Sequence, residues 1–230
     1  MGIRIFSASV RGAGHIANNT PNQDAVLTRQ WEHGWLAVVS DGMGSRKRSD
    51  IGSQCVCRAA FHVLKDASLD TPGRDIVLMI YQRWLDELGS VKPNDAVATC
   101  LIAWGQHSGQ IRLFQLGDGA LMYHGQEHGQ LSCRQGAAFS NETTGLGISR
   151  RYSDWIAKDI SLGKKGQGLA LMTDGISDDL VLADQFVPYL IQTLKRMSRR
   201  RGKKWLRAQL ENWPTPGHTD DKTLALIFWK

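Results

Sequence analysis

Short apolar runs, each interrupted by glycine, aspartate or asparagine, recur along the chain and predict many β-strands. The predicted strands cover residues 3–9, 25–28, 35–40, 99–104, 111–116, 120–124, 156–160, 169–173 and 224–229. Within two of them, residues 36–39 and 169–172 are apolar at every position. A continuous apolar run of this length is typical of a strand that is covered on both faces.

Three longer segments repeat their apolar residues at helical spacing. They predict helices over 50–64, with Ser49 as the capping residue, over 74–88, with Pro72 near its start, and over 184–197. The order is strands, two helices, more strands, and one helix before the last strand. Because strands and helices do not alternate strictly, two sheets covered by helices fit better than a doubly wound parallel sheet.

The composition is that of a globular protein, with 42% hydrophobic and 22% charged residues in 230. This length predicts a single domain over 1–230. No apolar run is long enough to span a membrane, and the first residues do not resemble a signal peptide, so we expect a cytoplasmic protein. The four cysteines, Cys55, Cys57, Cys100 and Cys133, form no CxxC pair and are interpreted as free, buried thiols.

The positive charge is concentrated in one place. The net charge is +6, and residues 195–207 hold eight basic residues and no acid. Removing eight positive charges from +6 leaves −2, so the rest of the chain is slightly acidic. Such a run is able to bind nucleic acid or an acidic partner. We favour a solvated helix face over nucleic-acid binding.

Aspartates stand at the ends of several predicted strands. Asp41, Asp118 and Asp174 each follow an apolar strand and precede a glycine. Asp24 and the pair 220–221 instead stand just before a predicted strand. An isolated Asp-Gly is usually a turn. Five such positions predict a cluster, and carboxylates that share a site repel one another until a cation compensates their charge. Oxygen ligands suit Mg²⁺ or Mn²⁺.

In order, these segments resemble the motifs of the protein phosphatase 2C family, the metal-dependent serine/threonine phosphatases. The matching segments are Asn22-Gln23-Asp24-Ala25, Ser40-Asp41-Gly42-Met43-Gly44, Leu116-Gly117-Asp118, Thr173-Asp174-Gly175-Ile176-Ser177-Asp178 and Asp220-Asp221-Lys222-Thr223. The resemblance spans roughly residues 7–229. It implies an α+β fold, a four-layer α-β-β-α sandwich of two antiparallel sheets flanked by helices.

The resemblance also implies roles for individual residues. Asp41 would bridge two Mg²⁺ or Mn²⁺ ions, with Asp174 and Asp220 as further ligands of the first. The carbonyl of Gly42 would bind the second ion. Asp24 would ligate a metal or hold metal-bound water. Asp41 and Asp174 are therefore also the expected catalytic residues.

Other positions extend this set or depart from the family pattern. Asp118 and Asp178 match positions linked to a third, weaker metal. Gln23 stands where the family has a metal-binding glutamate, and Asn19 where it has a phosphate-binding arginine. His15, in a Gly-x-x-His segment typical of a bacterial branch, is a candidate phosphate contact and catalytic residue, with a surface histidine as the alternative.

The implied function is hydrolysis of phosphoserine and phosphothreonine by direct attack of a metal-bridging water. Its partners would be phosphorylated proteins and a cognate serine/threonine kinase, and the segment 137–147 would form a flap beside the site. Three alternatives stay open. They are a catalytically weak or inactive regulatory module, nucleic-acid binding through 195–207, and hydrolysis of a small phosphorylated molecule.

Overall fold

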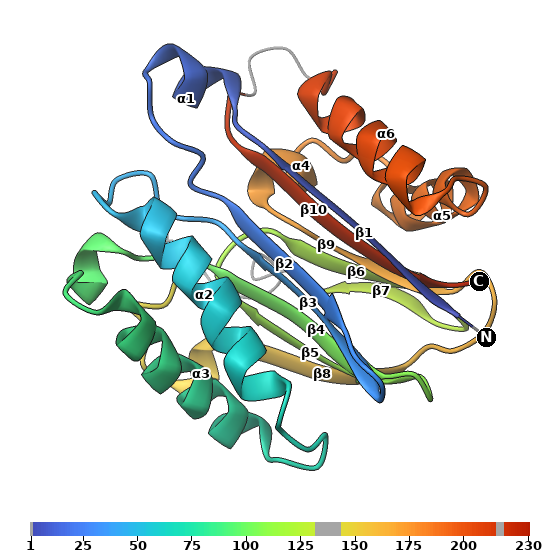
Figure 1. The fold of residues 1–230 in the computed structure, drawn as a ribbon, viewed down its shortest axis with the longest axis horizontal. Coiled ribbons are helices and arrows are strands. Elements are labelled where there is room, and N and C mark those ends of the chain that lie inside the picture. The colour runs from blue at the N-terminus through green and yellow to red at the C-terminus, as the bar shows by residue number, and fades with distance from the viewer. Residues whose placement is uncertain (1, 132–143, 215–218) are drawn as a thin grey trace.

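Two antiparallel sheets stack face to face, and helices cover both outer faces (Figure 1). The computed structural model describes residues 2–131, 144–214 and 219–230. The first sheet has the order β1 (Ile3–Val10), β10 (Lys222–Trp229), β9 (Gly168–Met172), β6 (Ala120–His124) and β7 (His128–Leu131). The second has the order β2 (Ala25–Gln30), β3 (Gly34–Ser40), β4 (Cys100–Gln106), β5 (Gln110–Leu116) and β8 (Ile156–Ser161). The predicted α-β-β-α sandwich is confirmed.

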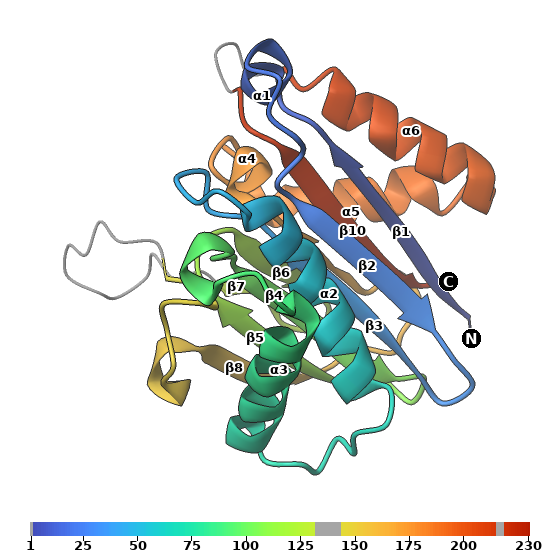
Figure 2. The same cartoon turned by 60° about the vertical axis from the view of Figure 1, so that its left-hand side comes forward.

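Each sheet has its own helical layer. Helices α2 (Ser49–Leu64) and α3 (Gly73–Leu88) pack on the second sheet, and α5 (Ala183–Leu194) and α6 (Arg199–Glu211) pack on the first (Figure 2). Four short elements complete the chain. These are α1 (Ala13–Ala17), α4 (Asp174–Ser177), η1 (Pro93–Asp95) and η2 (Tyr152–Asp154).

The apolar side chains form three layers, one between the sheets and one under each pair of helices. Strand β3 shows why its sequence is continuously apolar. Trp35, Ala37 and Val39 point into the layer between the sheets, whereas Leu36 and Val38 point toward α2 and α3. Successive side chains of a strand face opposite sides, so a strand covered twice needs apolar residues throughout.

The C-terminal helices differ from the prediction. One helix was expected over 184–197, but α5 ends at Leu194 and a separate helix begins at Arg199, where Ser198 Oγ accepts a hydrogen bond from the Arg201 amide (3.3 Å). Most of the basic run therefore lies on α6. Its buried residues, which include Gly202 and Leu206, are too few to give a clear apolar stripe in the sequence.

The remaining predictions concern the cysteines, the flap and the shorter elements. The cysteines Cys55, Cys57 and Cys100 are free and buried, as predicted, whereas Cys133 and most of the predicted flap lie outside the described residues. Strand β7 and the short helices α1 and α4 were not predicted. None of the described helices is both long and apolar enough to cross a membrane.

Candidate metal and active site

The predicted aspartates belong to segments that lie at one end of the sandwich, the end where Figure 1 shows α1 and α4. In the second sheet Ala25 pairs with Ser40, so Asp24 before β2 adjoins Asp41 after β3. In the first sheet Leu224 pairs with Met172, so the chain entering β10 adjoins the chain leaving β9. Antiparallel pairing thus brings together carboxylates that lie far apart in the sequence.

Asp41 is held by its backbone. Its amide donates a hydrogen bond to Thr99 Oγ1 (2.8 Å), and its carbonyl accepts one from the Thr99 amide (2.8 Å). At the next residue, Gly42, a Cβ atom would lie 2.5 Å from the Ser49 carbonyl oxygen. Only glycine fits this close approach, which explains why glycine follows the aspartate.

Asp24 links the two sheets. It is only 6% exposed, and its Oδ2 accepts a hydrogen bond from Thr173 Oγ1 (2.9 Å), which itself accepts one from the Thr223 amide (3.1 Å). Burial raises the pKa of Asp24 to about 8, and the negative charge of Asp221 adds to the shift. The other oxygen, Oδ1, is buried and has no hydrogen-bond partner among the described residues.

Asp41 experiences the same crowding of charge. Burial raises its pKa well above the usual range, and the charges of Asp24, Asp174 and Asp220 raise it further. Burial also raises the pKa of Asp174, and the negative charges of Asp220 and Asp178 raise it further. The structure therefore brings Asp24, Asp174 and Asp220 within electrostatic reach of Asp41, and Asp178 within reach of Asp174.

Asp221 has a different role from its neighbour Asp220. It is 2% exposed, and its oxygens accept hydrogen bonds from the amides of Gly12 (2.7 Å) and Gln23 (2.6 Å). Its Oδ2 also lies 2.8 Å from Nδ1 of His15, close enough for an ion pair, although the two are not aligned as a hydrogen bond. Asp221 thus anchors the loops that lead to the site.

The donor set fits a divalent cation. Oδ1 of Asp24 and Oδ1 of Asp174 are buried carboxylate oxygens without a hydrogen-bond partner among the described residues. Buried, unpaired carboxylates are costly, and a bound Mg²⁺ or Mn²⁺ would compensate their charge. Ligand atoms of His15, Asp220 and Asp221 also lie within 4.8 Å of one another.

Comparison with known protein families identifies the chain. The model described as "Protein phosphatase 2C" matches residues 11–211. The chain belongs to the protein phosphatase 2C family. Comparison with curated protein sequences gives no match.

Several solved structures share the fold over nearly the whole chain. The serine/threonine phosphatase of S. agalactiae aligns with a TM-score of 0.70 and 17% identity, covering 100% of both chains. The catalytic domain of the phosphatase PstP in complex with two manganese ions aligns at 0.67 and 17%, covering 98% of this chain and 97% of that one. RsbX in complex with magnesium aligns at 0.62 and 14%, covering 98% and 94%.

In this phosphatase 2C chain Gln23, the residue expected in place of a metal-binding glutamate, is 7% exposed. Its backbone amide donates to Asp221, and its carbonyl accepts hydrogen bonds from the Gly42 amide (3.1 Å) and from Ser53 Oγ (2.6 Å). The backbone of Gln23 therefore ties Asp41's loop to Asp221. Sequence reasoning treated this residue only as a ligand and missed its structural function.

The two candidates for a third metal lie at the same end of the phosphatase fold. Asp118 stands in the turn between β5 and β6, where Gly117 packs against Thr99, the residue that holds Asp41. Asp178 directly follows α4, and its charge acts on Asp174. The family resemblance placed Asp221 around the ligands and not among them, but the contacts with Gly12 and Gln23 by which it anchors the loops were not predicted.

Proposed function

We propose that this chain is a metal-dependent protein serine/threonine phosphatase. The observation that carries the proposal is the meeting of Asp24, Asp41, Asp174 and Asp220 at one end of the sandwich, in a chain of the phosphatase 2C family. Four partly or fully buried carboxylates are unfavourable unless a cation binds between them. A functional site, rather than the stability of the fold, therefore explains why they are present.

We assign the ligands as the family resemblance suggests. Asp41, Asp174 and Asp220 would hold Mg²⁺ or Mn²⁺ ions, with contributions from the Gly42 carbonyl and Asp24. Asp118, Asp178 and Gln23 are the outer candidates of this proposed set. Two ions are expected, and a third is possible. When bound, such ions would neutralise phosphoryl oxygens and make water a better nucleophile.

The residues around the ligands position the reacting groups. Thr99 fixes the backbone of Asp41, and Thr173 orients Asp24 from the opposite sheet. Nδ1 of His15 lies 2.8 Å from Oδ2 of Asp221, and we propose the other ring nitrogen, Nε2, as the contact for a phosphate oxygen. The water oxygen attacks phosphorus as the phosphorus–oxygen bond of the ester breaks, and one proton of that water ends on the leaving oxygen, so the products are inorganic phosphate and a free serine or threonine hydroxyl.

Direct attack by water also agrees with the state of the thiols. A phosphatase that uses a cysteine nucleophile needs an accessible thiol with a lowered pKa. Here burial raises the pKa of Cys57 to about 12, and burial raises the pKa of Cys100 well above its usual value. Cys55 is also buried, and its pKa is raised by burial. None of the three described thiols therefore suits a phosphoenzyme mechanism.

The expected substrates are phosphorylated proteins made by a cognate serine/threonine kinase. We further propose that residues 1–230 act as one catalytic domain in the cytoplasm. A catalytically weak, regulatory member of the family is the second candidate. It is favoured by Gln23, because a neutral amide oxygen is a poorer metal ligand than the carboxylate that it replaces.

Activity with manganese decides between these candidates. We expect the protein to release phosphate from a phosphothreonine peptide in the presence of Mn²⁺, and to lose this activity on addition of EDTA. Asp174→Asn should also abolish hydrolysis while far-ultraviolet circular dichroism stays unchanged. Activity that persists in EDTA would contradict the metal assignment, and a folded protein without any turnover would support the regulatory candidate.

A further inference from the structure

A groove of about 510 Å³ lies along helix α3, and none of the carboxylates of the proposed site lines it. One wall is the first half of α3, and the other is the segment 146–155, which includes η2. Figure 2 shows the gold turn of η2 beside α3. The proposed hydrolysis does not use this groove, so its shape and charge need a separate explanation.

The floor of the groove is apolar and rigid. Val77, Leu146 and Trp155 line it and belong to the buried core beneath α3. Two large side chains at its edge are exposed, Leu78 by 55% and Tyr152 by 38%. Exposed apolar side chains beside a preformed hollow are typical of surfaces that bind another protein.

The rim is positively charged. Arg74 on α3 and Arg150 and Arg151 on the opposite wall line the groove, and no acidic residue is among its described lining residues. Arg151 lies 3.6 Å from Asp154, but it is 82% exposed, so this pair neutralises little of the charge. An apolar floor with an arginine rim complements a segment that carries both acidic and apolar side chains.

The groove begins close to the proposed active site. Gly42 forms a β-bridge with Ala98, and Ala98 forms another with Leu146, which lines the groove. Neighbouring strands lie about 4.8 Å apart, so these two steps place Leu146 about 10 Å from Gly42. An extended peptide covers about 3.3 Å per residue, so three or four residues span this distance. One chain can reach both places.

We propose that this groove is a docking site for a phosphoprotein substrate, binding an acidic segment with an apolar anchor next to the phosphorylated residue. The inference rests on the proposed phosphatase function. Leu78 and Tyr152 contact the anchor, and Arg74, Arg150 and Arg151 contact the acidic side chains. The groove thereby selects among phosphoproteins without taking part in the chemistry.

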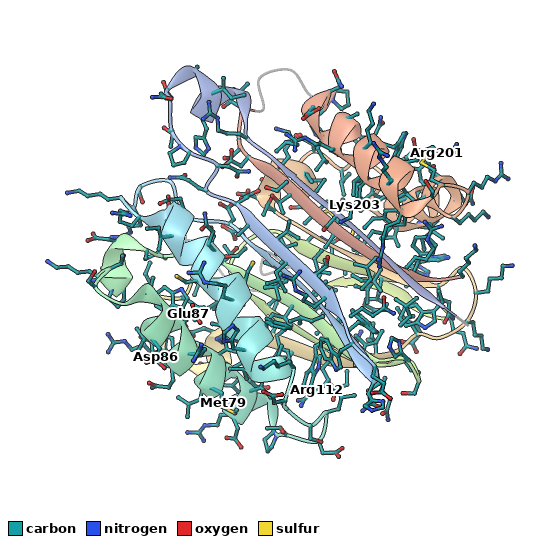
Figure 3. The ribbon with its side chains drawn as sticks, viewed as in Figure 1. Met79, Asp86, Glu87, Arg112, Arg201 and Lys203 are labelled. Carbon is teal, nitrogen blue, oxygen red and sulfur yellow. The ribbon has the colours of Figure 1, made fainter. Side chains whose placement is uncertain are left out.

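The test compares matched peptides and matched variants. Two acidic substrates are phosphothreonine peptides that carry four glutamates and one leucine. In one peptide this tail lies four residues before the phosphothreonine, and in the other it lies four residues after it. Two further peptides have lysine in place of each glutamate. The groove variants are Arg74→Glu with Arg150→Glu, and Leu78→Asp. The control is Arg200→Glu with Arg201→Glu on α6, which changes the charge equally. Figure 3 shows Arg201 on the opposite side of the sandwich from Met79 of α3.

We expect the groove variants to raise KM for one of the acidic peptides about tenfold and to leave kcat within about twofold. Hydrolysis of p-nitrophenyl phosphate, which is too small to reach the groove, should not change. The α6 control should behave as the unchanged protein does. Equal KM values for the acidic and lysine peptides, or an equal loss in the α6 control, would overturn the proposal.

Binding without turnover separates the two proposals. Fluorescence anisotropy with the unphosphorylated acidic peptide should show binding that both groove variants weaken and the control does not. Such binding in a protein without phosphatase activity would support the groove and contradict the proposed function. Turnover without peptide binding would overturn the groove alone. Tighter binding of a single-stranded oligonucleotide than of the acidic peptide would also overturn it.

Discussion

The two ends of the sandwich are built from the same strands and differ in chemistry. Strand β3 carries Trp35 as its second residue at one end and leads into Asp41 at the other. Strand β10 follows Asp220 and finishes at Trp229. The two tryptophan rings pack edge to face, 6.1 Å apart, and at most 2% of either residue is exposed. The apolar end thus lies opposite the acidic end.

Burial has opposite energetic consequences at these two ends. Removing a tryptophan from water stabilises the fold whether or not a ligand is present. Removing several carboxylates from water destabilises the fold until a cation binds. The comparison shows that one end contributes stability, whereas the other is maintained at the expense of stability for its chemistry.

The largest expected effect comes from removing a charge at the acidic end. Asp41→Asn should reduce manganese-dependent hydrolysis of a phosphothreonine peptide at least ~10³-fold, equivalent to about 4 kcal/mol of transition-state stabilisation. The metal-free variant should be as stable as the unchanged protein, or more stable, because it relieves the repulsion around Asp41. Phosphate release and urea unfolding in EDTA measure the two effects. A clear loss of stability in EDTA would contradict the comparison.

Truncation of a side chain at the apolar end should lower the stability of the fold and leave metal binding unchanged. Trp35→Ala should lower the free energy of unfolding by about 3–5 kcal/mol, because it leaves a cavity between the sheets. Trp35→Phe should cost less, since Nε1 of Trp35 is buried without a hydrogen-bond partner among the described residues. Urea unfolding gives the stability, and calorimetry gives the Mn²⁺ affinity of the folded variants. An altered Mn²⁺ affinity would show that the two ends are coupled.

Counted per pH unit, the dependence of stability on pH is the smallest expected effect. The pKa of Asp24 is about 8 in the folded protein, and that of Asp41 is also raised, so the folded state binds more protons than the unfolded state. The metal-free protein should therefore be more stable near pH 4 and lose about 1 kcal/mol per pH unit as the pH rises toward 8. Melting temperatures in EDTA and in excess Mn²⁺ test this. The cation should flatten the profile, and a flat profile in EDTA would contradict the charge crowding.

Local pattern predicted the central elements well. The apolar runs around 36–39 and 169–172 lie in β3 and β9, because strands buried on both faces cannot carry polar residues. The pattern failed where few apolar residues mark an element. Helix α6 buries only Gly202, Leu206 and Leu210 in thirteen residues, so its charges hid its boundary with α5.

The candidate site shows the same division. Each aspartate was visible as an acid at the end of a strand, and the family motifs predicted which ones belong together. Asp221 could not be assigned in this way. Its function depends on the amides of Gly12 and Gln23, which are 209 and 198 positions away in the chain.

The sequence by itself determined the alternation of buried strands with acidic ends and the membership in a metal-dependent phosphatase family. These features are local, because side-chain alternation and turn chemistry act over a few residues. Only the tertiary structure decided that Asp24 receives a hydrogen bond from the opposite sheet, that Asp221 anchors the loops, and that arginines line a groove beside α3. Such contacts join distant segments, and their geometry exists only once the two sheets have packed together.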